Sequence, residues 1–278
     1  MAFLIDPLQY RFFCHGLLVA FLVGSLCGLL GVYIVLRKMS YIGHGLAHAV
    51  FGGAVASFLL GVNFYLGAGV WGLGAVLLID RLASRRDMAA DTAIGIITTA
   101  SFAVGVALMS RTRRFVQDFE AALFGNILGV SERDLLLIVL VTVGTGCAIA
   151  MLYKPLLFST FDPEVAQVAG IPTRRIQLLF SSLLALAILA SMQVLGVTLI
   201  AAALVIPAAT ARLLTHNFAR MLGLSTTLGG LTALLGMYLS YYLDIASGAS
   251  IVLFSTLVFT IALGYRHLTT RATAGPLL

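Results

Sequence analysis

The feature that most constrains this chain is a series of long apolar runs that recur between residues 12 and 265. In hydrocarbon every backbone N–H and C=O group must be satisfied internally, so runs of this kind fold as membrane-crossing helices. A helix rises ~1.5 Å per residue and needs about 20 residues to cross a ~30 Å core. The runs predict nine crossings, at 12–36, 41–60, 64–79, 92–110, 134–153, 176–192, 195–214, 219–243 and 249–265.

The break between the sixth and seventh runs decides that count. Residues 176 to 214 form an apolar stretch too long for one crossing, and Gln193 is its one strongly polar side chain. We place a tight turn near Met192 and Gln193, and eight crossings are the alternative. Charged residues make up 10% of the chain, against ~25% in a soluble domain. We therefore expect an all-α polytopic membrane protein, with a single transmembrane domain over residues 1–278.

The basic residues set the expected orientation. The net charge is +6, but the lysines and arginines lie in short loops between apolar runs. There they act as topology signals rather than as a nucleic-acid-binding surface. Twelve of the 17 follow the odd-numbered runs, so we assign those loops to the cytoplasm and the N-terminus to the outside. The basic run at 111–114 is the exception.

The second apolar run carries two histidines one helical turn apart, His44 and His48. Residues four apart share one face of a helix. Ionisable side chains are costly in hydrocarbon and face a bundle interior or an aqueous path. Two imidazoles directed at one point make the pair a candidate metal site, and a structural role in which the imidazoles hold helices together is the alternative. A zinc-protease helix would need a glutamate between them, and Gly45 stands in that position, which argues against an intramembrane metalloenzyme.

Three more residues in the apolar runs are candidates for the ion path or a gate. Asp91 opens the fourth run and equally suits the N-cap of a helix. Gln193 lies at the predicted turn. Pro207 removes one backbone hydrogen bond and should kink the seventh helix, for which a purely structural role is the alternative. Neither lysine follows the glycines of a phosphate-binding loop, so we do not expect ATP hydrolysis of that kind in this chain.

Two connections differ from ordinary loops. Residues 119–129 are apolar but too short to cross, which favours a segment that dips into the membrane or lies at its interface. The other connection predicts a short helix that begins at an Asp162 cap, continues with Pro163 and Glu164, and stops at Gly170. A plain surface connector is the alternative.

Several motifs occur in order along nearly the whole chain. They are LRKMSYIG at 36–43 with LAHAV at 46–50, ADTAIGI at 90–96, LFGNIL at 123–128, DPE at 162–164 with AGIP at 169–172, and QVLGVTLI at 193–200 with IPAATAR at 206–212. The chain resembles the permease subunits of bacterial zinc and manganese ABC importers, the ABC-3 family. The resemblance implies a homodimer in the lipid of the bacterial plasma membrane. It also implies ATP-binding subunits that hydrolyse ATP and an extracytoplasmic metal-binding protein that delivers the ion.

The resemblance also implies roles for individual residues. The short helix at 162–170 becomes a coupling helix that docks on the ATP-binding subunit. The family pattern Gly-Asp-x-x-x-His stands where this chain has Gly43, His44 and His48, so His48 carries over and His44 replaces an aspartate. Imidazole suits Zn(II) better than Mn(II). We expect zinc as the cargo, with a manganese or iron ABC permease as one alternative. A proton-coupled carrier that works without an ATPase, with the histidines as relay, is another.

Overall fold

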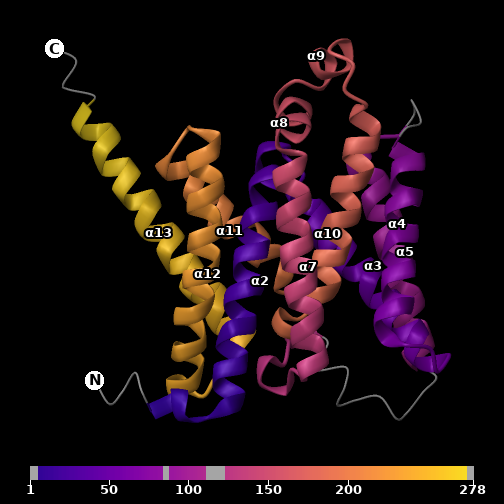
Figure 1. The fold of residues 1–278 in the computed structure, drawn as a ribbon, viewed down its shortest axis with the longest axis vertical. Helices are drawn as coiled ribbons and strands as arrows, with labels where there is room; N and C mark the ends of the chain where they lie inside the picture. The colour runs from indigo at the N-terminus through magenta and orange to yellow at the C-terminus, as the bar shows by residue number, and fades with distance from the viewer. Residues whose placement is uncertain (1–5, 84–87, 111–122, 274–278) are drawn as a thin grey trace.

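The computed structural model describes residues 6–83, 88–110 and 123–273, and all regular structure in these ranges is helical (Figure 1). Eight helices are long and apolar enough to cross a membrane: α2 (Arg11–Leu36), α3 (Ser40–Leu59), α4 (Phe64–Ala83), α5 (Ala90–Ser110), α7 (Glu132–Met151), α10 (Thr173–Leu195), α12 (Phe218–Leu243) and α13 (Ser247–Thr273). The shorter elements are η1 (Asp6–Gln9), η2 (Ile127–Gly129), α8 (Tyr153–Phe161), α9 (Pro163–Val168) and α11 (Ile200–Leu214). The all-α polytopic fold is confirmed.

The seventh predicted crossing is shorter than expected. Helix α11 has 15 residues and a length of ~22 Å, less than the ~30 Å hydrocarbon core. The predicted turn near Met192 and Gln193 is wrong, because α10 continues to Leu195. The chain turns at Gly196, where φ is +75°, a conformation that glycine adopts without a steric penalty. Gln193 therefore lies in the last turn of α10.

The helices alternate in direction through the bundle. The ends of α2, α4, α7 and α11 lie at the same end of the molecule as α8, α9 and the C-terminal end of α13 (Figure 1). We call this the α9 end; the start of α2 lies at the opposite end. The loops predicted to be cytoplasmic thus gather at one end, and their assignment to the cytoplasm stays a prediction. The exceptional run at 111–114 lies outside the described residues.

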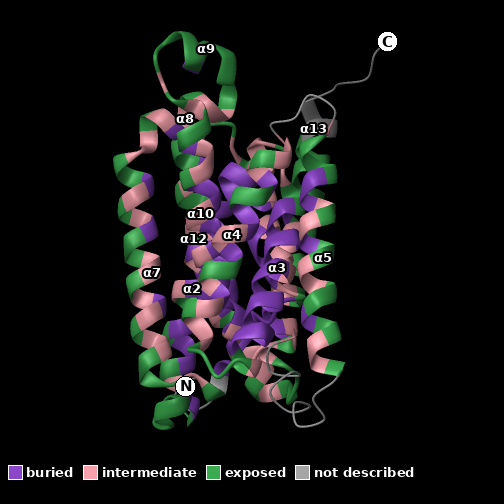
Figure 2. Cartoon of the chain, turned by 90° about the vertical axis from the view of Figure 1, so that its right-hand side faces the viewer, coloured by how far each residue is buried: buried purple, intermediate pink, exposed green. Residues whose placement is uncertain are grey.

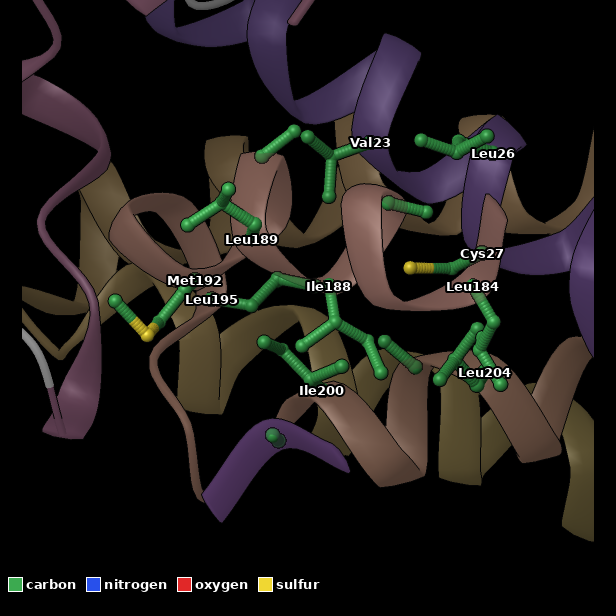
Figure 3. Packing of buried hydrophobic residues seen from close by; sticks show 14 of the residues in the cluster. Val23, Leu26, Cys27, Leu184, Ile188, Leu189, Met192, Leu195, Ile200 and Leu204 are labelled. Carbon is green, nitrogen blue, oxygen red and sulfur yellow. The ribbon is translucent and has the colours of Figure 1, made fainter. Parts of the chain in front are cut away.

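Burial separates central from peripheral helices (Figure 2). In the most apolar 18-residue stretch of α3, 78% is buried, against 17% in the corresponding stretch of α7. Glycines bring α2 close to its neighbours: a Cβ on Gly28 would lie 2.2 Å from the Ser225 carbonyl oxygen of α12, and one on Gly31 would lie 1.8 Å from the Leu204 carbonyl oxygen of α11. Such close approach is how small residues pack membrane helices. Figure 3 shows the adjoining core, where Val23, Leu26 and Cys27 of α2 lie near Leu184 and Ile188 of α10 and Ile200 and Leu204 of α11.

Two connections interlock at the end opposite α9. The amide of Asn126 donates to the Gln193 carbonyl at 2.8 Å, and the Thr198 hydroxyl donates to the Leu123 carbonyl at 2.8 Å. A Cβ on Gly125 would lie 2.4 Å from the Val194 carbonyl oxygen, so the two backbones touch. The predicted dipping segment at 119–129 is described only from residue 123. In that part it packs against the α10–α11 connection, which satisfies some of its backbone groups with protein.

Candidate functional site

Helix α3 carries both candidate metal ligands in its first half. The Nε2 atoms of His44 and His48 lie 3.0 Å apart, and the two rings meet edge to face with centroids 4.4 Å apart. Both side chains are half-buried. The Tyr41 ring lies 5.9 Å from His44, and Phe102 of α5 lies 4.6 Å from His48, measured between centroids. The prediction that the imidazoles share one face and converge is confirmed; metal binding by them stays a prediction.

Small residues allow α5 to approach the histidine helix. A Cβ on Gly45 would lie 2.8 Å from a methyl carbon of Ile94, and one on Gly52 would lie 2.2 Å from the Ser101 carbonyl oxygen. Gly105 of α5 meets Gly52 in the same way, at 2.9 Å from its Cα. A larger side chain in these positions would push the two helices apart.

A cavity of about 170 Å³ lies between α3 and α5. Its lining consists of Tyr41, His44, Gly45, His48, Thr98, Thr99 and Phe102. Two of these residues, Tyr41 and Thr99, are exposed, so the cavity reaches the surface of the chain. Both imidazoles are therefore accessible from a surface of this single chain.

The donor set in this cavity is small. Among the described residues there is no group of three or more His, Cys, Asp or Glu side chains that could hold a metal ion. His48 Nδ1 is buried and has no hydrogen-bond partner in the described ranges. In most protein metal sites the second nitrogen of a histidine ligand is held by a carbonyl, a carboxylate or water. One chain therefore presents two imidazole side chains here, and any metal coordination shell would need further groups.

The candidate path residues Asp91, Gln193 and Pro207 do not line this cavity. Asp91 is exposed in the first turn of α5, and the helix already begins at Ala90. Pro207 is buried within α11, which continues through it as a helix. Roles in a path or gate stay predictions for all three.

Gln193 belongs to a polar cluster at the end opposite α9, which the sequence reasoning missed. Its side chain lies close to Tyr65 of α4, whose hydroxyl donates to the Asp134 carboxylate of α7. Asp134 also accepts from the Ser131 hydroxyl at 2.6 Å and the Ser131 amide at 2.9 Å. The spacing Ser131-x-x-Asp134 is a readable capping signal, whereas its link to Tyr65 joins distant parts of the chain.

The predicted short helix is present as α9, and its caps are as expected. The Asp162 carboxylate accepts from the Val165 amide at 3.0 Å, with Pro163 at the first helical position and Glu164 in the first turn. Gly170 has φ +79°, and the Ile171 amide donates to the Ala166 carbonyl at 2.9 Å, which is the closure of a Schellman cap. The sequence reasoning missed α8, which precedes it. Helix α9 projects beyond the spanning helices (Figure 1).

Comparison with known proteins identifies the family of this chain. Residues 9–266 match the ABC 3 transport family.

The chain belongs to the ABC 3 transport family.

Relatives of this ABC 3 transport family chain match it along nearly their whole length. A manganese transport system membrane protein, MntC, of Halalkalibacterium halodurans is 40% identical over 94% of this chain and 90% of its own. A protein of Haemophilus influenzae named "Probable iron transport system membrane protein" is 35% identical over 96% and 98%. The solved structure of PsaBC from Streptococcus pneumoniae in complex with Fab has a TM-score of 0.85 and 36% identity, over 93% of each chain. The names of the first two proteins refer to manganese and iron, so they favour the alternative cargo over the expected zinc.

Proposed function

We propose that this chain is the membrane permease of an ATP-driven importer of a divalent first-row metal, with manganese as the cargo. The observation that carries the proposal is the pair of imidazole Nε2 atoms 3.0 Å apart on the central helix α3. It occurs in a chain that is 40% identical to a manganese transport permease over 94% of its length. His44 and His48 are the proposed ligands of the passing ion.

The state of the pair fits a transient rather than a closed site. The two Nε2 atoms lie at hydrogen-bonding distance from each other, so one of them carries the proton of that bond, and an arriving divalent ion would replace it to take both nitrogens as ligands. The choice of cargo rests on the relatives, whose names refer to manganese and iron. They support manganese, with iron as the second candidate, in place of zinc.

A second copy of the chain would complete the site. Two imidazoles from one chain leave most of a coordination shell open, and the cavity reaches the surface. Helix α5 exposes apolar residues beside it, among them Ile96 at 51% and Val104 at 42%. A two-fold related copy on this face would bring a second pair of imidazoles to the first. Water would supply the remaining ligands and let the ion leave.

Helix α9 is the proposed docking element for the ATP-binding subunit. It projects from the bundle, and its Val165 and Val168 side chains are 55% and 90% exposed. Apolar side chains on a projecting, capped helix suit insertion into a groove of a partner. Asp162, Glu164 and Gly170 shape this helix. The end opposite α9 would then receive the metal-binding protein from outside the cell.

Reconstitution tests this proposal. The permease is placed in liposomes with and without its ATP-binding subunit, and uptake of Mn(II), Fe(II) and Zn(II) is measured with and without ATP. We expect Mn(II) uptake that requires both the subunit and ATP. His44→Ala and His48→Ala should each lower it by ~10-fold or more, since a positioned metal ligand is lost. His15→Ala, at an exposed position of α2, is the control. Uptake driven by a pH gradient without the subunit would instead favour the proton-coupled carrier.

A further inference from the structure

The connection between α2 and α3 is short and fixed. Three residues, Arg37, Lys38 and Met39, join the two helices. Lys38 has φ +57°, a left-handed conformation that is uncommon outside glycine. The Met39 amide donates to the Ile34 carbonyl at 3.0 Å. Because His44 follows in the second turn of α3, a displacement of this connection moves the pair of histidines.

Arg37 contacts both helices that flank α9, namely α8 and α10, and so links them to this connection. Its Nε donates to the Thr160 hydroxyl of α8 at 3.0 Å, and its Nη1 donates to the Gln177 side-chain oxygen of α10. Its Cζ also lies 4.8 Å from the centre of the Phe180 ring of α10. Helix α8 leads into α9 and α10 leads out of it. One guanidinium group therefore contacts the chain on either side of the projecting helix.

This arrangement costs free energy. Burial lowers the pKa of Arg37 to about 10, so the side chain stays charged at neutral pH. No salt bridge to Arg37 is found among the described residues, and Nη2 is buried without a hydrogen-bond partner in the same ranges. A partly buried charge held by neutral groups is destabilising relative to an apolar packing of the same volume. The planar fork of arginine, which lysine lacks, is what reaches two helices at once.

We propose that Arg37 is a positioning residue. It couples α9 and its flanking helices α8 and α10 (the α9 arm) to the start of α3, the helix that carries His44 and His48. This inference rests on the proposed docking of the ATP-binding subunit at α9. When the nucleotide cycle moves α9, α8 and α10 move with it, and Arg37 transmits the displacement to the start of α3. Without Arg37 the arm moves but the histidine pair does not follow, so ATP hydrolysis is separated from metal release.

The test is the ratio of Mn(II) imported to ATP hydrolysed, measured in liposomes that contain the permease and its ATP-binding subunit. Arg37→Met should keep the co-purifying subunit and its ATP turnover but lower this ratio by about tenfold, within the usual range of coupling between sites. Arg37→Lys keeps the charge but loses the fork, and should restore the ratio only in part. Arg175→Met, an exposed arginine on α10, is the matched control and should behave as the unchanged protein.

Two further variants keep the test decisive if Arg37→Met does not assemble. Thr160→Val and Gln177→Leu each remove one contact of Arg37, and each should lower the ratio. A ratio unchanged in Arg37→Met, or unchanged in both of these variants, overturns the role of Arg37. If a variant lost both subunit binding and the import ratio, the coupling role of Arg37 would also be overturned, because Arg37 would then only hold α8 and α10 in place. Failure of the unchanged protein to import Mn(II) with ATP would overturn the proposed function itself. This outcome is measured on the unchanged protein before any variant, so it is distinguished from failure of the role of Arg37.

Discussion

Replacing Gly52 with alanine tests the α3–α5 contact beside the cavity that His44 and His48 line. The new Cβ would lie 2.2 Å from the Ser101 carbonyl oxygen, whereas carbon–oxygen contacts normally measure ~3.3 Å. Because the obstacle is helix backbone, α3 and α5 must separate by about 1 Å, and overpacking of this kind costs ~1–3 kcal/mol. The apparent Tm in detergent should fall by ~2 to 10 °C.

The same separation should reach the site. Phe102 follows Ser101 in the chain and its ring lies 4.6 Å from that of His48, so moving α5 withdraws one wall of the cavity. We expect Gly52→Ala to lower Mn(II) uptake as well as Tm.

Gly95→Ala is the matched control on α5. A Cβ at this position meets nothing within 4 Å, and alanine favours a helix over glycine by up to ~1 kcal/mol. Its Tm should equal or exceed that of the unchanged protein, with normal uptake. If Gly52→Ala melts no lower than Gly95→Ala, the close α3–α5 contact does not exist as described.

Three other substitutions test separate parts of the molecule. His44→Asp exchanges a nitrogen donor for a hard carboxylate oxygen, which should raise the ratio of Mn(II) to Zn(II) uptake in competition assays; an unchanged ratio would mean that residue 44 does not touch the ion. Glu164→Arg places a positive charge at the start of α9, and should reduce co-purification of the ATP-binding subunit while size-exclusion chromatography shows an intact permease. Tyr65→Phe removes the hydrogen bond to Asp134, and should cost ~1–2 kcal/mol, visible as a lower Tm; an unaltered Tm would show that this hydrogen bond adds no net stability.

The spans and α9 were predictable because their signals are local. A long apolar run must become a helix in lipid, and the caps of α9 lie within its own ten residues. The turn after α10 was misplaced because a polar side chain was taken as its marker. Gln193 lies inside the last turn of α10, close to Tyr65 of another helix, so it marks no turn. The backbone requirement at Gly196 was the better signal. Helix α8 was missed because Leu152 before it provides no side-chain cap.

The candidate site likewise has one part that the sequence predicts and another that it does not. The convergence of His44 and His48 follows from their spacing alone. The contribution of Phe102 and Thr98 does not, because it depends on which helix packs against α3. The close approach of Gly45 and Gly52 to α5 determines that pairing, and glycines give no periodic signal of their partner. For the cargo, imidazole donors favoured zinc, whereas the names of the relatives refer to manganese and iron.

The interlocked connections at the end opposite α9 have a consequence for how this chain can be altered. Loops normally tolerate insertions and tags, since their backbone is solvated and few atoms depend on its course. Here the Asn126 amide and the Thr198 hydroxyl each bond to the other connection, and Gly125 touches the backbone beside Val194. An added residue in either connection would shift both and leave polar backbone groups without partners close to the lipid. Epitopes and fluorescent labels therefore belong elsewhere, and length variation between homologues should be rare at 123–126 and 193–199.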